Sequence, residues 1–407
     1  MTSPRRAEGA PAPGRPAWVE VDLDAIAHNV RTARQALRPG AQLMAVVKAD
    51  AYGHGAVPVA RAALRAGAAW LGVAVLSEAL ELRAAGLRAP ILILGWTPPE
   101  LAREAVRHDV ALTVFRAEEA RELARLARET GRPARVHLKV DTGMGRLGVP
   151  PDERGLAAAE ALAREPLVLW EGTFTHFACA DEEDPAPTRR QIERFSAFLA
   201  RLEAAGLRPG LRHAANTAGL FRFPDAHFDL VRLGIGLYGY APSPFVTTPA
   251  PLQPALAWKA RLAQVKAVAA GEAISYGATY VTSAPEWIGT VPVGYADGYR
   301  RAFSNVGRVL VGGVERPVRG RVCMDQFMIG LGPAPAAAAA PAAVAAPPAL
   351  AAPAAPGDEV VLLGAQGEAR LTANDLAQWA GTIAYEILTS LDERLPRVYT
   401  GAALEEE

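Results

Sequence analysis

The feature that most constrains the fold is a regular alternation of short apolar runs and amphipathic segments between about residue 41 and residue 240. The eight apolar runs are QLMAVVKA, AWLGVAV, APILILG, ALTVF, ARVHLKV, VLWEGTFTHFA, LRHAANTA and DLVRLGIGLYG. Most are separated by segments such as LSEALELRAAGL and AEEARELARLARETG, in which apolar residues recur three and four positions apart. Strand followed by helix, repeated, favours a parallel sheet. Eight strands predict a (β/α)₈ barrel, with a doubly wound open sheet as the alternative.

The pattern changes after about residue 250. Runs such as WIGTVPV, RVLVGGVERPVRGRVCM and DEVVLLG follow one another without long helical segments, and Gly312-Gly313 predicts a hairpin turn. We therefore expect a mostly-β domain over residues 251–407, closed by one helical segment from Ala373 to Leu388. Within it, residues 333–356 are almost entirely Ala and Pro. Such a composition cannot form a packed core and predicts a surface insertion without chemistry.

The 407 residues exceed the usual span of one hydrophobic core. We expect a disordered extension over residues 1–16, a barrel over 17–250 and the β domain after it.

Acidic and basic residues number 43 each, which gives no electrostatic argument for nucleic acid or an anionic membrane. No apolar run approaches the roughly 20 residues that cross a bilayer. The two cysteines imply no disulfide framework, and the N-terminal arginines precede no apolar core of a signal peptide. These features favour a cytoplasmic protein.

Polar residues collect where the predicted barrel strands end. Barrel enzymes build their active sites at this end of the strands. Five of the eight predicted strands deliver such residues there: Lys48, Arg146, His176, Asn216 with Thr217, and Arg232 with Gly234. Each residue alone is more often a structural or surface residue. Together they indicate an active site.

Glycines surround the last predicted strand at positions 234, 236 and 239. The loops after the seventh and eighth strands of a barrel commonly hold a phosphate on backbone N–H groups, and glycine allows this close approach. A partly desolvated lysine has a lowered pKa and can form a Schiff base with a carbonyl compound. Lys48 beside a phosphate site therefore predicts pyridoxal 5′-phosphate, which carries both an aldehyde and a phosphate. No metal site is predicted.

Many separated motifs resemble those of alanine racemases, which are pyridoxal-phosphate enzymes of fold type III. The motifs are AVVKADAYGHG, HLKVDTGMGRLG, THFACAD, HAANTAG, VRLGIGLYG, SYGATY, PVGYADGY, GRVCMDQ and TIAYEIL, and the resemblance extends from Trp18 to Thr400. It implies an N-terminal (β/α)₈ barrel with a C-terminal mostly-β domain. It also implies interconversion of L-alanine and D-alanine, with peptidoglycan as the usual destination of the product.

The resemblance assigns the two acid–base residues to Lys48 and Tyr276, on opposite faces of the substrate. Inversion through a planar carbanion needs one proton removed from one side and one delivered from the other. Arg232 would face the pyridine nitrogen without giving it a full proton, which favours racemisation over transamination. The cofactor contacts implied are Lys48, Tyr52, His176, Asn216, Thr217, Arg232, Gly234, Ile235 and Tyr385.

The remaining roles are also implied by the resemblance. Arg146 would hold the substrate carboxylate, and a carbamylated Lys139 would orient it. Tyr276, Met324 and Asp325 would complete the site of a partner subunit in a head-to-tail homodimer, with the backbone N–H of Met324 near the substrate carboxylate. Tyr280 and Tyr385 would narrow the entrance.

Two other functions remain open at the level of sequence. One is a racemase of the same fold that acts on serine, lysine or arginine, because pocket volume alone would separate these substrates. The other is a barrel-only pyridoxal-phosphate-binding homeostasis protein without catalysis. The residues after the barrel, and Tyr276 in particular, argue against the second.

Overall fold

The computed structural model describes residues 15–336 and 352–402. The chain forms two compact units, one from Leu23 to Pro254 and the other from the segment ending at Asp22 together with the segment from Ala255 onward. Within the described residues, none of the helices combines the length and apolar character needed to span a membrane.

The unit from Leu23 to Pro254 is a nearly closed barrel of eight parallel strands, in the order β8-β7-β6-β5-β4-β3-β2-β9. Each predicted run supplies one strand: β2 (Gln42–Val46), β3 (Trp70–Val73), β4 (Ile91–Ile93), β5 (Ala111–Val114), β6 (Ala134–Lys139), β7 (Val168–Phe174), β8 (Leu211–His213) and β9 (Leu230–Leu233). Two backbone hydrogen bonds link β9 to β8 and the residues after it: Asp229 N–H to Arg212 O at 2.9 Å, and Arg232 N–H to Ala215 O at 3.0 Å. The predicted (β/α)₈ barrel is confirmed.

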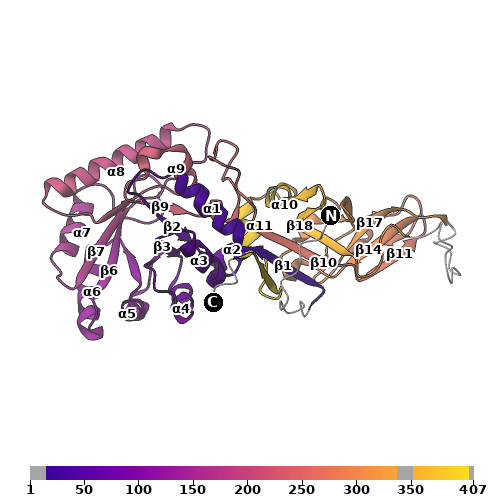
Figure 1. Ribbon diagram of the computed structural model, residues 1–407, viewed down its shortest axis with the longest axis horizontal. Helices are drawn as coiled ribbons and strands as arrows, with labels where there is room; N and C mark the ends of the chain where they lie inside the picture. The colour runs from indigo at the N-terminus through magenta and orange to yellow at the C-terminus, as the bar shows by residue number, and fades with distance from the viewer. Residues whose placement is uncertain (1–14, 337–351, 403–407) are drawn as a thin grey trace. The chain divides into compact units, whose positions relative to one another are not determined.

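Helices connect the strands and lie around the outside of the barrel, which runs from indigo to magenta in Figure 1. They are α1 (Leu23–Gln35), α2 (Lys48–Gly53), α3 (Ala56–Arg65), α4 (Leu76–Ala84), α5 (Pro99–Arg107), α6 (Ala117–Thr130), α7 (Glu153–Ala163), α8 (Ala186–Ala204) and α9 (Thr217–Arg222), with short 3₁₀ turns η1 (Pro224–Ala226) and η2 (Ile235–Tyr238). Helix α6 illustrates the pattern, because Ala120, Leu123 and Ala127 are buried at helical spacing. Gly131 then ends it with φ of +68°.

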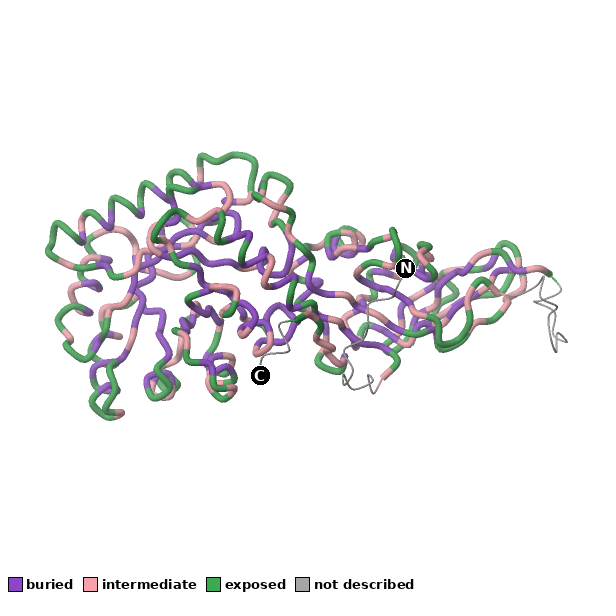
Figure 2. The backbone as a smooth tube through the Cα atoms, viewed as in Figure 1, coloured by how far each residue is buried: buried purple, intermediate pink, exposed green. Residues whose placement is uncertain are grey.

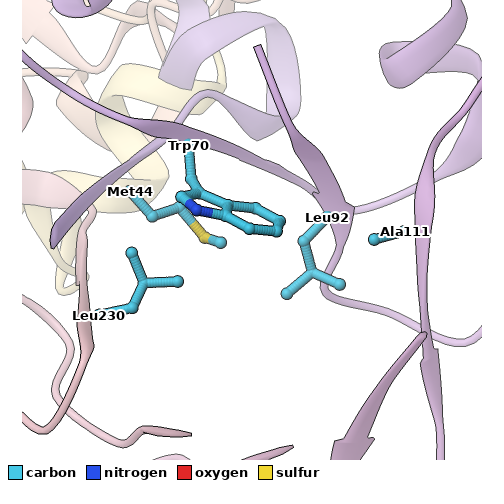
Figure 3. Packing of buried hydrophobic residues seen from close by; sticks show 5 residues of the cluster. All are labelled: Met44, Trp70, Leu92, Ala111 and Leu230. Carbon is cyan, nitrogen blue, oxygen red and sulfur yellow. The ribbon is translucent and has the colours of Figure 1, made fainter. Parts of the chain in front are cut away.

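An apolar cluster lies among the barrel strands. Met44, Trp70, Leu92, Ala111 and Leu230 pack together there from five different strands (Figure 3). Figure 2 shows burial along the backbone: the barrel strands are mostly buried, whereas the helices alternate between buried and exposed residues. A Cβ atom at position 72 would lie 2.9 Å from Met44 Sδ and 3.2 Å from Leu94 Cδ1, so a side chain there would displace these neighbours. Burial of each large side chain stabilises the barrel by roughly 1.5–3 kcal/mol.

The second unit is built on a ten-stranded sheet. Its path is β11-β14-β17-β16-β15-β18-β10-β1-β20, with β19 paired to β18, and a separate ribbon pairs β12 with β13. The strands are β1 (Ala17–Asp22), β10 (Leu256–Arg261), β11 (Gln264–Val268), β12 (Ala273–Ile274), β13 (Tyr280–Val281), β14 (Glu286–Val291), β15 (Arg308–Val311), β16 (Val314–Arg319), β17 (Phe327–Pro333), β18 (Glu359–Gln366), β19 (Ala369–Leu371) and β20 (Arg397–Thr400). Gly312 and Gly313, with φ of +60° and +75°, form the predicted turn between β15 and β16. The predicted mostly-β domain is confirmed.

Short helices complete this unit: η3 (Tyr276–Ala278), η4 (Tyr295–Asp297), η5 (Arg301–Phe303), α10 (Ala373–Ala380) and α11 (Ala384–Thr389). The single helical segment expected from Ala373 to Leu388 is therefore two helices. Gly381, with φ of +64°, caps the first of them in a left-handed conformation that ends it.

The ends of the predicted segments differ from the structure in two places. Ala17–Asp22, expected at the start of the barrel, forms β1 and pairs antiparallel with β10 and parallel with β20. A strand-like pattern predicts a strand but does not identify the strand with which it pairs. The partner strand, which is distant in the sequence, determines the sheet that the segment joins.

The extension expected over residues 1–16 falls largely outside the described residues. Its last two residues make defined contacts, since Arg15 pairs with Asp297 and Pro16 O accepts the N–H of Arg261. Of the insertion expected over residues 333–356, which connects β17 to β18, residues 337–351 also lie outside the described part.

Candidate active site

Lys48 follows strand β2 by two residues and opens a left-handed helical turn. Ala49, Asp50, Ala51 and Tyr52 all have φ between 50° and 53°, in a helix that runs from Lys48 to Gly53. For residues with a Cβ atom this conformation costs roughly 1–2 kcal/mol each. Strain of this kind is kept where the surroundings over-determine the backbone, which is common at functional sites.

Two carboxylates hold the turn in this conformation. Glu78 Oε1 accepts the N–H of Ala49 at 2.7 Å, and Glu78 Oε2 accepts the N–H of Ala74 at 2.6 Å. Asp50 Oδ1 accepts the N–H of Ala56 at 2.8 Å. Lys48 is thereby held at the end of β2, next to Glu78 at the start of α4. Burial, followed by the positive charge of Arg146, lowers the pKa of the Lys48 amine, while Glu78 partly opposes the shift.

A small polar cradle lies where the turn meets the end of β9. The Tyr52 ring stacks on Tyr238 with 4.7 Å between centroids, and burial raises the pKa of Tyr52 to about 12, so its hydroxyl stays protonated. The N–H of Gly234 donates to Thr217 Oγ1 at 2.9 Å. A Cβ atom at position 234 would meet Tyr52 Oη at 3.3 Å and Thr217 Oγ1 at 3.7 Å. The hydroxyls of Tyr52 and Thr217 therefore border a space that a side chain at position 234 would fill.

Asn216 has a local structural role in this structure. It is the N-cap of α9, and its Oδ1 accepts the N–H of Gly219 at 2.9 Å. A cap of this kind satisfies one of the backbone donors that a helix leaves unpaired at its start. By fixing the start of α9, Asn216 positions the hydroxyl of the following residue, Thr217, beside Gly234.

Arg232 lies on β9 with only 3% of its surface exposed. Its Nη2 donates to the carbonyls of Thr175 and Ala214 at 2.9 and 2.7 Å and approaches His176 Nδ1 at 3.2 Å. Its Nη1 lies 2.8 Å from His213 Nδ1. Because a guanidinium only donates, His213 must accept through Nδ1 and carry any proton on Nε2, and the approach of Nη2 to Nδ1 favours the same tautomer for His176. Burial and the charge of Arg232 lower the pKa of His176 well below its usual value, so this imidazole is neutral.

Lys139 is the last residue of β6, and it is buried. Its Nζ lies 4.4 Å from the centroid of the Phe174 ring. Burial lowers the pKa of Lys139 to about 7, with further lowering by the charges of Arg232 and Arg146. About half of this amine is therefore unprotonated, and so nucleophilic, at neutral pH. Arg146 itself is exposed in the loop after β6.

Two basic side chains, Arg232 and Lys139, are buried at this end of the barrel. Within residues 15–336 and 352–402, neither Arg232 nor Lys139 has a carboxylate as a hydrogen-bond or ion-pair partner. Buried cations are normally paired, so this site favours an anionic ligand. A cofactor with a phosphate, a phenolic oxygen and an aldehyde fits these residues. The cradle at Gly234 would take the phosphate, and the Lys48 amine would take the aldehyde.

In the second unit, Tyr276 begins the 3₁₀ turn η3, and Met324 and Asp325 lie in the loop between β16 and β17. Tyr276 is 72% exposed and Met324 54% exposed. Ser275, with φ of +67°, precedes Tyr276, and its hydroxyl donates to Arg321 O at 2.7 Å. Asp325 pairs with Arg394 at 2.9 Å.

Tyr280 and Tyr385 are also in the second unit. The Tyr280 hydroxyl donates to Glu286 Oε2 at 2.5 Å, and Arg319 lies 4.4 Å from the centroid of its ring. Tyr280 is thus held by neighbours of its own unit, while Tyr385 lies in α11 and is partly buried. Tyr295, in the motif PVGYADGY, is 43% exposed and donates its N–H to Cys323 O, next to Met324.

Sequence reasoning missed four residues that support the site: Glu78, His137, His213 and Tyr238. Tyr238 donates its hydroxyl to Val46 O at 2.8 Å and stacks on Tyr52. His137 and His213 occur in motifs that the resemblance used, and a histidine within an otherwise apolar buried strand was the available signal. The described residues contain no group of three or more side chains suited to hold a metal ion.

Comparisons with known proteins agree over both units. The chain matches the family described as alanine racemase, N-terminal domain, over residues 21–242, and that described as alanine racemase, C-terminal domain, over residues 255–399. An alanine racemase from Symbiobacterium thermophilum is 50% identical over 387 residues, which is 95% of this chain and 98% of the relative.

Solved structures give the same result. The structure of an alanine racemase from Bacillus anthracis with bound L-Ala-P has a TM-score of 0.86 at 41% identity and covers 97% of both chains. That of a histidine racemase from Leuconostoc mesenteroides has a TM-score of 0.84 at 31% identity and covers 97% of this chain and 100% of the other. With matches to both of its domains and half of its residues identical to those of a relative of nearly equal length, this chain belongs to the alanine racemase family of pyridoxal-phosphate-dependent isomerases.

Proposed function

We propose that this enzyme interconverts L-alanine and D-alanine, with Lys48 on one face of the substrate and Tyr276 of a second copy on the other. The observation that carries the proposal is that Lys48, an amine of lowered pKa, begins the same strained turn as Tyr52, whose hydroxyl borders the cradle at Gly234. Pyridoxal phosphate, when bound, would make the Cα–H of the amino acid acidic enough for a side chain to remove.

The residues of this chain would hold the cofactor as follows. Tyr52, Thr217 and the backbone of Gly234 and Ile235 would bind the phosphate, together with Tyr385. Arg232 would face the ring nitrogen, since four acceptors already hold its two Nη atoms in place. Asn216 would act chiefly by capping the helix that carries Thr217.

Proton transfer needs a base on each side of Cα. Lys48 Nζ is suited to one side because burial and the charge of Arg146 lower its pKa and so favour the unprotonated amine that a base requires. Tyr276 Oη would act on the other side, with neutral His176 nearby to stabilise the phenolate. His176 accepts from Arg232 through Nδ1, which leaves an Nε2 proton to donate to a phenolate oxygen.

The substrate carboxylate would be bound by Arg146 and by the backbone N–H of Met324. Lys139 would carry a carbamate, whose negative charge would orient Arg146 and neutralise the excess positive charge at this end of the barrel. The neutral amine that CO₂ requires is supported by the lowered pKa of Lys139.

A head-to-tail homodimer would bring Tyr276, Met324 and Asp325 of one subunit to the barrel of the other. The exposure of Tyr276 and Met324 supports this, as does that of Val75 and Trp96, which follow the ends of barrel strands β3 and β4 and are 48% and 45% exposed. A cytoplasmic enzyme that supplies D-alanine for peptidoglycan accords with this activity.

The shared site can be tested by mixing two inactive variants. Lys48→Ala and Tyr276→Phe chains should each lack activity, and heterodimers formed from them should regain part of it, because one of the two composite sites is intact. No recovery in demonstrated heterodimers would rule out shared sites. Incubation of the wild-type enzyme with L-alanine, L-serine, L-lysine, L-arginine and L-histidine, followed by chiral analysis, would measure substrate preference. Equal rates on the larger amino acids would contradict an alanine-specific enzyme.

A further inference from the structure

Asp297 is a fully buried carboxylate in the second unit that the proposed function does not use. Arg15 contacts both of its oxygens, Nη1 to Oδ1 at 2.5 Å and Nη2 to Oδ2 at 2.9 Å. Arg394 adds a second cation, with Nε 3.4 Å from Oδ1. A two-pronged contact of this kind fixes direction as well as distance. Residues almost 400 positions apart, on either side of Asp297 in the sequence, therefore converge on one side chain.

The turn that contains Asp297 is hydrogen-bonded to the loop that contains Met324. Asp297 Oδ2 accepts the N–H of Gly294 at 2.9 Å, which closes the turn. From this turn, the N–H of Tyr295 donates to Cys323 O and the N–H of Ala296 donates to Met324 O, both at 3.0 Å. A side chain at position 294 would lie 2.2 Å from Met324 O, so only glycine allows this approach. The two loops are joined through their backbones.

Arg394 connects the same two loops through side chains. Besides its contact with Asp297, its Nη2 lies 2.9 Å from Asp325 Oδ1. Arg15 precedes β1 and Arg394 precedes β20, and these two strands pair in parallel in the sheet. The pairing of β1 with β20 therefore places both arginines next to Asp297. Asp297 in turn fixes the turn whose N–H groups bind the backbone carbonyls of Cys323 and Met324.

We propose that Arg15 is a positioning residue for the substrate site, which acts through Asp297 on the Met324 loop. The inference rests on the proposed function in one respect, the contact between the Met324 N–H and the substrate carboxylate. An ion pair that served stability alone would have no reason to affect substrate affinity. A pair that sets the position of the Met324 backbone should affect the binding of the carboxylate more than the chemical step.

The test compares Arg15→Ala, Arg15→Lys and wild-type holoenzyme as full-length chains. Amide hydrogen exchange, read by mass spectrometry, should become about tenfold faster in Arg15→Ala for residues 294–298 and 323–326, with the barrel peptides unchanged. The KM for alanine should rise about five- to tenfold while kcat stays within about twofold, the signature of lost ground-state binding. Arg15→Lys, which keeps the charge but not the two-pronged geometry, should give an intermediate KM.

Arg308→Ala is the matched control, because it removes an exposed ion pair with Glu315 from the same sheet. It should change neither exchange in the two loops nor KM. If Arg15→Ala is poorly folded, Arg15→Lys carries the test, since it keeps a positive charge at Asp297 and loses the two-pronged contact.

Each outcome bears on a different step. Faster exchange in the two loops with a raised KM supports the inference. Unchanged exchange overturns it and leaves the proposed catalytic residues untouched. Faster exchange with an unchanged KM overturns the link to substrate, and it places the fault in the proposed role of Met324 rather than in the Arg15 network.

Discussion

Arg232 Nη1 lies 2.8 Å from His213 Nδ1 inside the barrel, and this contact sets the protonation of a chain of buried rings. His213 must accept from the guanidinium, so its proton is on Nε2, which lies 2.9 Å from His137 Nδ1. The proton of His137 is then on its own Nε2, which has no hydrogen-bond partner in the part of the chain that the structure describes. A further proton on either ring would break a hydrogen bond and add charge next to Arg232.

The first prediction concerns acid stability. Burial and Arg232 lower the pKa of His137 from 6.5 to about 3 and that of His213 well below 6.5, so both are neutral when folded. Between pH 6.5 and about 4 the unfolded chain binds the extra protons, and the folded chain loses stability as the pH falls. The free energy of unfolding should decrease by roughly 1.4 kcal/mol per pH unit for each such histidine. Urea unfolding at a series of pH values measures this slope.

The control variants separate buried from exposed histidines. His137→Phe should reduce the slope, and His108→Gln, on the exposed end of α5, should leave it unchanged. An equal slope in His137→Phe and the wild type would show that this buried ring does not set the acid sensitivity.

The second prediction concerns Lys139. Because its pKa is lowered to about 7, this amine should react with CO₂ near neutral pH and bind it as a carbamate. Enzyme equilibrated with carbon-13 bicarbonate should show one carbamate signal by NMR, which weakens as the pH falls below about 7. The signal should be absent in Lys139→Gln and retained in Lys266→Gln, where an exposed lysine is changed. A signal that persists in Lys139→Gln would assign the carbamate elsewhere.

The third prediction concerns the strained turn after Lys48. Glu78→Ala leaves the N–H groups of Ala49 and Ala74 without their acceptor and should lower the free energy of unfolding by roughly 1–3 kcal/mol. Release of the turn should also weaken cofactor retention, measured by dialysis and absorbance. Glu119→Ala is the matched control, because Glu119 accepts the N–H groups of Phe115 and Arg116 at the start of α6 in the same way. It should lose similar stability and keep the cofactor. Equal cofactor loss in both variants would argue against a specific role for Glu78.

The fourth prediction concerns reaction specificity. Arg232→Glu would place an acceptor opposite the carbonyls of Thr175 and Ala214, so a lower thermal midpoint is expected. A carboxyl group facing the pyridine nitrogen would let this nitrogen keep a proton and make the ring a stronger electron sink. More turnovers should then end in transamination, measured as pyridoxamine phosphate formed per D-alanine. An unchanged ratio in folded Arg232→Glu enzyme would refute this account of specificity.

The amino-acid pattern predicted most of the elements, although not where each of them ends. The short apolar runs predicted all eight barrel strands, because a strand that is buried on both faces needs a nearly continuous apolar sequence. Gly312-Gly313 predicted its hairpin because few other residues adopt two successive positive φ values. Lys48, Arg232 and Thr217 could be assigned to one end of the barrel, since parallel strands all end on the same side.

Only the tertiary structure decided which distant residues meet. It assigned Ala17–Asp22 to the second sheet and Arg15 to Asp297, because these partners are set by hydrogen bonds and ion pairs between segments hundreds of residues apart. It also decided protonation, since Lys139 and His137 look ordinary in the sequence and acquire lowered pKa values only when the barrel closes around them. Local patterns depend on a residue's own neighbours along the chain, whereas desolvation and pairing depend on neighbours that folding supplies.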